Sequence, residues 1–186
     1  CGLSWESAML TTQYYLYLYY NDTDIIKELY GLDKNWMEKV ARIHPNKIVD
    51  SGLSDHESLE PVPVELTGTC HYMQCARIMT KFAEFMGDKD AAVKYKRLAD
   101  ELKVLIREMF WDKPVTDKIN RQTLFSTLLY HNIVPEEDLV AAKDFVIKKN
   151  NEISEKVTKI GKNVIDLIIS KGITSADFSR GTIYKY

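Results

Sequence analysis

The chain has 186 residues, of which 45% are hydrophobic and 28% are charged, and its 27 acidic and 25 basic side chains give a net charge of −2. This composition is that of an average globular protein and excludes disordered, collagen-like and supercharged chains. Because phosphate contacts need a clustered excess of basic residues, the near-neutral charge argues against a dedicated nucleic-acid binder. No apolar run reaches the roughly 18 residues that span a bilayer, so we expect no membrane span.

The start of the chain shows no basic segment followed by an apolar one, so we expect no signal peptide within these residues. The chain begins at Cys1 without a Met. We therefore expect either that processing removed an upstream segment or that the chain is a piece of a longer protein. An alternative for Cys1 is the lipidated cysteine of a bacterial lipoprotein, although the pattern of helices places this residue within a domain.

The spacing of apolar residues predicts helices in chain order over residues 7–20, 24–44, 63–86, 88–110, 122–130, 135–149 and 153–169. Asn21 and Asp22 end the first of them, and Gly87 ends the third. The last is less regular, and no segment predicts a strand. An acidic loop over residues 45–62 is long enough to be functional.

The predicted helices alternate in character. The first, third and fifth are apolar on nearly every face, whereas the second, fourth and sixth are amphipathic. A helix that is apolar all round is buried on every side. Hairpins that pair one such helix with an amphipathic partner indicate a two-layer ring of helices, and the fold class is therefore predicted as all-α, built from helical hairpins.

The three cysteines are too few for a disulfide framework. Cys70 and Cys75 lie five residues apart in a predicted helix, which separates them by about 140° around its axis. They cannot share one metal ion without a bend in the helix, so we expect reduced, packed cysteines and no metal site.

Two segments in the first half of the chain resemble the catalytic domain of bacterial α-L-rhamnosidases, glycoside hydrolase family 78. The sequence GLSWESA at residues 2–8, followed by LYLYYND at residues 16–22, is similar to the family's Trp-Gly-Asp-Ala stretch and its "LYLYYGD". The sequence GLSDH at residues 52–56, followed by PVELTGT at residues 63–69 and by Tyr72, resembles "GLGDW…TPxELxxTAYYY".

Two further segments follow in the family's order. RQTL at residues 121–124 with VPEE at residues 134–137 is similar to "TQTAYALAL…LVPEE". GITS at residues 172–175 with GTIY at residues 181–184 is a weaker match to "GHITTGxxGTxY". No single motif is diagnostic, and the order and spacing of all four carry the resemblance.

The resemblance implies that residues 1–186 are a single region, about half of an (α/α)6 toroid, which packs against the rest of its own catalytic domain. It implies hydrolysis of terminal α-L-rhamnose from glycosides or polysaccharides by inversion, with carbohydrate (rhamnosides) as substrate and without a cofactor. The family's main catalytic carboxylates lie upstream of the Trp5 motif and downstream of the Tyr184 motif. We therefore assign no catalytic residue in this chain and expect it to be inactive alone.

Four residues are candidates for sugar binding. Trp5 offers an aromatic face for the apolar side of a sugar ring, and Glu6 beside it offers acceptors for hydroxyl groups. Asp55 matches a pocket aspartate of the family, and His56, where the family usually has Trp, is a candidate to bind a hydroxyl or to stack on the sugar. For each there is also a purely structural reading: a core tryptophan, a solvated carboxylate, a loop or cap residue, and a surface histidine.

The chain departs from the family pattern near the expected pocket. His56 replaces a Trp, and Glu6 and Ser7 replace Gly-Asp after Trp5. Two alternatives therefore stay open. One is a non-catalytic helical-hairpin module that binds sugars or proteins, and the other is a toroid hydrolase that acts on another sugar.

Overall fold

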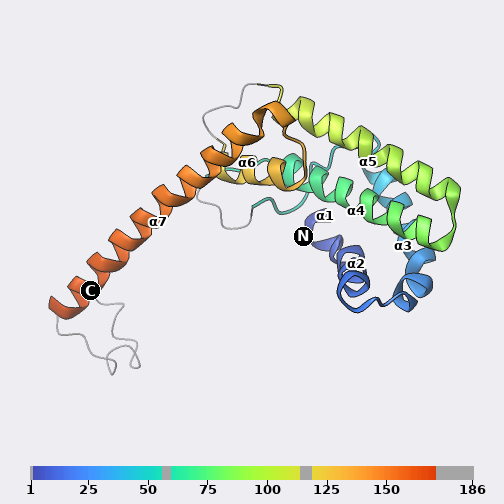
Figure 1. The fold of residues 1–186 in the computed structure, drawn as a ribbon, viewed down its shortest axis with the longest axis horizontal. Helices are drawn as coiled ribbons and strands as arrows, with labels where there is room; N and C mark the ends of the chain where they lie inside the picture. Colours follow the sequence, from blue (N-terminus) through green and yellow to red (C-terminus); the bar gives the residue numbers. More distant parts are fainter. Residues whose placement is uncertain (1, 56–59, 114–118, 171–186) are drawn as a thin grey trace. The chain divides into compact units, whose positions relative to one another are not determined.

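The computed structural model describes residues 2–55, 60–113 and 119–170, and no strand forms within these ranges. The elements in chain order are α1 (Leu3–Glu6), α2 (Ala8–Tyr20), α3 (Asp24–Ile43), α4 (Val64–Met86), α5 (Lys89–Phe110), α6 (Arg121–Tyr130), the 3-10 turn η1 (Glu136–Asp138) and α7 (Leu139–Ser170) (Figure 1). The all-α prediction is confirmed. The chain divides into two compact units, Cys1–Lys143 and Asp144–Tyr186.

The ends of α2 and α4 lie where the sequence predicts them. Asn21 follows α2 in the left-handed conformation (φ 53°), and its N–H donates to the Tyr17 carbonyl over 2.9 Å. Gly87 follows α4 with φ 72° and donates to the Glu84 carbonyl over 3.1 Å. A left-handed residue lets the chain turn back while the last helical carbonyls keep their partners.

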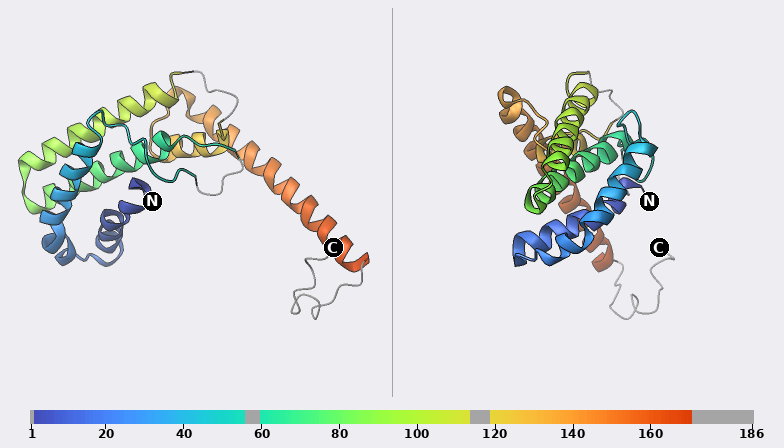
Figure 2. Two further views of the ribbon diagram at one scale, coloured as in Figure 1. Left: turned by 180° about the vertical axis from the view of Figure 1, so that it is seen from behind. Right: turned by 90° about the vertical axis from the view of Figure 1, so that its right-hand side faces the viewer.

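The hairpin of α4 and α5 forms the centre of the first unit, and the two helices run side by side in opposite directions (Figure 2). Helix α4 is buried on most of its faces: its buried residues are Leu66, Gly68, Thr69, Cys70, Tyr72, Met73, Cys75, Ala76, Ile78, Met79, Phe82 and Ala83. Helix α5 buries a single stripe made of Ala91, Tyr95, Ala99, Leu102 and Ile106. This pair is the inner and outer helix that the alternation predicts.

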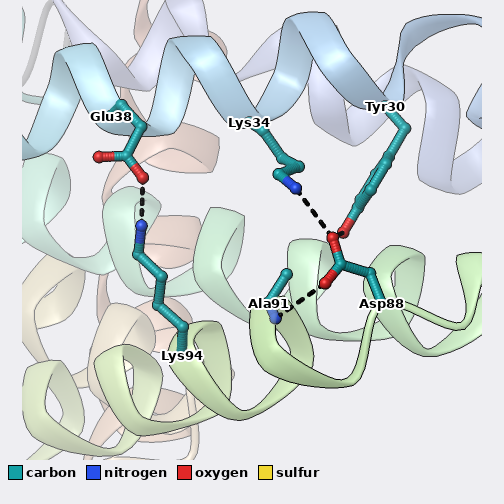
Figure 3. Close-up of polar contacts among 6 residues, drawn as sticks. All are labelled: Tyr30, Lys34, Glu38, Asp88, Ala91 and Lys94. Atoms are coloured by element: carbon teal, nitrogen blue, oxygen red, sulfur yellow. Dashed lines mark hydrogen bonds and ion pairs between the residues drawn. The ribbon is translucent and has the colours of Figure 1, made fainter.

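Polar contacts tie α3 to the beginning of α5 (Figure 3). The Asp88 carboxylate caps α5 by accepting a backbone N–H of its first turn over 3.1 Å. The same carboxylate accepts hydrogen bonds from the Tyr30 hydroxyl (3.0 Å) and the Lys34 ammonium (2.8 Å). One turn further along α5, Lys94 forms an ion pair with Glu38. These contacts set the position of α3 along the α4–α5 hairpin.

Helix α2 differs from the expectation that it is buried on every side. Its buried residues are Leu10 and Gln13, while Leu18, Tyr19 and Tyr20 are 50%, 75% and 78% exposed. Helices α3 and α4 pack on one side of α2 in the described part of the chain. The opposite side is apolar and exposed.

The predicted helices over 135–149 and 153–169 are one continuous helix, α7, preceded by the turn η1. The prediction of a break was wrong because Asn150 and Asn151 weaken a helix only slightly. Neither Gly nor Pro occurs between the two predicted helices, over residues 150–152. Within the second unit α7 exposes Ile153, Val157 and Ile160.

Candidate functional site

The segment that carries Trp5 lies against the segment that carries Asp55. Gly2 and Gly52 form an isolated antiparallel bridge. A Cβ atom on Gly2 would stand 2.4 Å from the Cα of Gly52, and Gly2 has φ 83°, so both the close approach and the backbone conformation require glycine here. Two segments that are fifty residues apart in sequence thereby become neighbours.

The segment before Asp55 is also fixed on α4. The Val49 N–H donates to the Thr69 hydroxyl over 3.1 Å in a buried position. Beside it, a Cβ on Gly68 would stand 2.6 Å from the Val49 side chain and 3.1 Å from its carbonyl oxygen. The absence of a side chain at Gly68 therefore allows the loop to pass directly over the helix.

Trp5 and Glu6 point away from the core on the single turn of α1. Leu3 and Ser7 on the same turn are buried, and this anchors the turn. Trp5 is 62% exposed, so its ring is not a core tryptophan in the described structure. An exposed aromatic face next to a carboxylate is the combination that a sugar ring needs, because one side of the ring is apolar and its edge carries hydroxyl groups.

Asp55 lies half-buried and is held by α6. Its Oδ2 accepts a hydrogen bond of 2.6 Å from the Thr123 hydroxyl. The Ser54 hydroxyl donates to the Val62 carbonyl over 2.6 Å and accepts the Asp55 N–H. The Asn120 N–H donates to the Pro61 carbonyl over 2.9 Å, which ties the residues before α4 to the residue before α6.

These contacts link three segments that precede the predicted inner helices: α1 before α2, residues 49–55 and 60–63 before α4, and Asn120 before α6. Trp5 and Asp55 lie on two linked segments, and Glu6 is next to Trp5. His56 lies outside the described residues, as do the two motifs at residues 172–184. The structure thus links the segments of three of the four predicted site residues.

Thr123 is not among the site residues predicted from the sequence, although it lies inside the RQTL motif that carries the resemblance. Its role becomes visible only when the loop before α4 is seen against α6. The signal available in the sequence was a hydroxyl in the first turn of the helix that begins directly after its cap residue Asn120.

A buried polar cluster lies behind α1. The Ser7 hydroxyl donates to the Ser4 carbonyl (3.1 Å) and lies 3.5 Å from Nδ1 of His71. The rings of His71 and His131 are 6.4 Å apart. Burial, followed by the neighbouring His71 and Arg77, lowers the pKa of His131 to about 4. Both histidines are therefore neutral at neutral pH, as expected of packing residues.

The described residues offer no group of three His, Cys, Asp or Glu side chains that could hold a metal ion. Cys70 and Cys75 are buried and free, as predicted, and burial raises the pKa of Cys70 to about 12. No helix in the described part of the chain combines the length and the hydropathy of a membrane span.

The family of the chain is established by its similarity to known proteins. The sequence profile of the bacterial alpha-L-rhamnosidase 6 hairpin glycosidase domain matches residues 2–165. The chain belongs to the bacterial α-L-rhamnosidase six-hairpin glycosidase family. The six-hairpin domain is a helical toroid, so the described hairpins are part of an (α/α)6 ring.

A solved structure of an α-L-rhamnosidase from Dictyoglumus thermophilum has the same arrangement, with a TM-score of 0.68 and 26% sequence identity. The match covers 79% of this chain and 17% of that chain, so this chain spans about a sixth of the length of the solved relative. None of the curated proteins matches the sequence. The family and fold expected from the resemblance are confirmed.

Proposed function

We propose that residues 1–186 form one region of the catalytic domain of an α-L-rhamnosidase and supply part of its sugar pocket. The parent enzyme hydrolyses terminal α-L-rhamnose from glycosides or polysaccharides. The observation that carries the proposal is the Gly2–Gly52 bridge, which places the exposed Trp5 segment beside the Asp55 segment within a six-hairpin glycosidase domain. The aromatic face of Trp5 and the carboxylate of Asp55 therefore belong to adjoining segments.

Each candidate residue has a role in this pocket. The Trp5 ring stacks on the apolar face of the rhamnose ring, and the carboxylates of Glu6 and Asp55 accept hydrogen bonds from its hydroxyl groups. His56 binds a further hydroxyl or stacks on the ring. Selectivity follows from such acceptors, because a sugar that lacks the matching hydroxyl leaves a desolvated carboxylate unpaired.

The bond-breaking step needs two further carboxyl groups. In an inverting glycosidase one protonates the leaving oxygen while the other activates a water on the opposite face of the sugar, and the two stand roughly 6.5–9.5 Å apart. We propose that these groups come from the rest of the parent protein, and that this chain binds and orients the sugar between them.

The exposed side of α2 supports packing against the rest of the catalytic domain. Leu18, Tyr19 and Tyr20 lie on a helix that is apolar on nearly every face, yet half or more of each is exposed. Apolar patches of this kind mark interaction surfaces. In a closed ring of six hairpins the neighbouring hairpin covers such a helix, so we propose that α2 borders the remainder of the ring.

An aryl α-L-rhamnoside assay tests the proposal. The complete parent protein is expected to release the aryl group, and the 186-residue chain alone is expected to be inactive. In the parent, Trp5→Ala and Asp55→Ala are expected to raise KM by about tenfold or more, the effect of losing a stacking partner or a charged hydrogen-bond acceptor. Asp90→Asn, which changes an exposed carboxylate on α5, is the matched control. Turnover by the chain alone would contradict the proposed division of roles.

A second candidate is a toroid hydrolase for another sugar. It is favoured by the departures at Glu6 and His56, which replace family residues in the segments that form the proposed pocket. A panel of aryl glycosides on the parent separates the two candidates. Preference for another sugar together with weak turnover of the rhamnoside would favour the second.

A further inference from the structure

The hydroxyl of Thr123 is used differently from the hydroxyls of three other helical threonines in the described structure, Thr11, Thr67 and Thr80. Thr11, Thr67 and Thr80 each donate to a backbone carbonyl three or four residues earlier, at 3.0, 3.3 and 2.9 Å. This back-bonding is the ordinary choice for a threonine in a helix. Thr123 instead donates to the Asp55 carboxylate, 68 residues away in sequence, at 2.6 Å.

Contacts other than the one with Asp55 hold the backbone of Thr123 in place. It lies in the first turn of α6, and its backbone N–H donates to the side chain of the cap residue Asn120 over 3.1 Å. The branched side chain has few rotamers, so a fixed backbone leaves the hydroxyl only a small number of directions. A distance of 2.6 Å is that of a hydroxyl donating to an ionised carboxylate.

Asp55 is fixed from its other side as well. Its N–H is accepted by the Ser54 hydroxyl, which donates in turn to the Val62 carbonyl. The side-chain bond from Thr123 then selects one rotamer of the carboxylate and occupies Oδ2. Among the residues that the structure describes, no hydrogen bond to Oδ1 competes with a ligand, and the carboxylate has further lone pairs as acceptors.

We infer that Thr123 is a positioning residue for the sugar-binding carboxylate of Asp55. This rests on the proposed function, in which Asp55 accepts a hydrogen bond from a rhamnose hydroxyl. A carboxylate at the end of a loop loses rotamer freedom when it binds a ligand, and that loss weakens affinity. Thr123 removes the loss in advance by holding the carboxylate in one orientation before the sugar arrives.

The test uses the complete parent protein and compares Thr123→Val, which keeps the shape but removes the hydroxyl, with Thr123→Ser, which keeps the hydroxyl. Thr80→Val is the matched control, because the Thr80 hydroxyl donates to a carbonyl of its own helix. KM for an aryl α-L-rhamnoside, the dissociation constant for free L-rhamnose and the thermal midpoint are measured for each variant. The same substitutions are made in an Asp55→Ala background.

Thr123→Val is expected to raise KM and the dissociation constant for rhamnose by about tenfold, the effect of one hydrogen bond to a charged group, with kcat changed less. Thr123→Ser is expected to stay within about twofold of wild type, and Thr80→Val to change the midpoint alone. In the Asp55→Ala background Thr123→Val is expected to have no further effect on either constant, because the group that it positions is gone.

Equal effects of Thr123→Val in both backgrounds would overturn the inference, since Thr123 would then act without Asp55. An unchanged affinity in Thr123→Val, with a clear loss in Asp55→Ala, would also overturn it while leaving the proposed function intact. If Asp55→Ala itself leaves rhamnose affinity unchanged, the proposed role of Asp55 is wrong and the inference fails with it.

Discussion

Replacing Asp33 by asparagine is expected to stabilise the protein at neutral pH and to have little effect near pH 4. The Asp33 side chain is fully buried between α2 and the core, where its Oδ1 accepts a hydrogen bond from Gln13 Nε2 over 3.1 Å. In the described structure neither Oδ2 of Asp33 nor Oε1 of Gln13 has a hydrogen-bond partner. Burial raises the pKa of Asp33 from 3.8 to about 6, and the bond from Gln13 offsets this only in part.

The sign of the pH dependence follows from comparing the protonation of Asp33 in the folded and the unfolded chain. Below pH 3.8 the carboxyl group is protonated in both the folded and the unfolded chain, so it has no ionic effect on stability. As the pH rises from 3.8 to about 6, the unfolded chain releases its proton while the folded chain keeps it, and stability falls. Above about pH 6 the folded chain holds a buried charge as well, and the free energy of unfolding falls no further on account of Asp33.

The magnitude follows from the same pKa. A rise from 3.8 to about 6 corresponds to roughly 3 kcal/mol at about 1.36 kcal/mol per pKa unit. Asparagine keeps the shape and the acceptor oxygen for Gln13 but carries no charge. The free energy of unfolding of Asp33→Asn relative to wild type is therefore expected to rise by about 2–3 kcal/mol between pH 4 and pH 7.

Urea unfolding of both proteins at several pH values measures this difference. Other titrating groups affect both proteins equally and cancel. Glu28→Gln, which neutralises an exposed carboxylate on the same helix, is the control and is expected to show a much smaller trend. A difference between Asp33→Asn and wild type that does not vary with pH would refute the reasoning, because Asp33 would then not ionise in this range.

Three further predictions concern packing and surface. Gly68→Ala is expected to lower the free energy of unfolding by about 1–3 kcal/mol in denaturant unfolding, because the added Cβ would press on Val49. Gly31→Ala is its control: a Cβ there has nothing within 4 Å, and the change is expected to stabilise α3 by about 0.5–1 kcal/mol. Thr69→Val is expected to lose about 1–3 kcal/mol in the same assay, since it leaves the buried Val49 N–H unpaired, and Thr69→Ser to restore most of it. The isolated chain is expected to self-associate through the exposed apolar side of α2, and Tyr19→Lys is expected to reduce this association in analytical ultracentrifugation, because Tyr19 is three-quarters exposed.

The sequence predicts the helices and their pairing well because these depend on local signals. Residues such as Asn21 and Gly87 stop helices through backbone conformations that few other residues adopt, and Asp88 begins the next helix through its own side chain. The continuity of α7 was missed because Asn150 and Asn151 are weak breakers, and a weak local signal does not end a helix whose flanks both favour it.

The candidate site is less predictable, because it depends on contacts between distant segments. That Trp5 and Asp55 belong to one region was predicted through the family resemblance alone. The means by which they meet, a backbone contact between Gly2 and Gly52, leaves no periodic trace in the sequence. The bond from Thr123 to Asp55 is likewise set by how α6 packs on α4, and a single threonine gives no indication of its partner.

Helices α2 and α4 show what an apolar pattern measures. Both are apolar on nearly every face, and the same pattern predicted burial for both. Helix α4 lies between α1, α2, α3, α5 and α6 and is buried, whereas α2 contacts its neighbours on one side and exposes Leu18, Tyr19 and Tyr20. An apolar pattern alone therefore does not distinguish a helix that the described residues cover from a helix that they leave exposed on one side. If the parent ring covers α2, these three side chains should become protected from solvent in the complete protein while remaining accessible in the isolated chain. Chemical labelling of the two tyrosines in both forms distinguishes this arrangement from a surface that stays open.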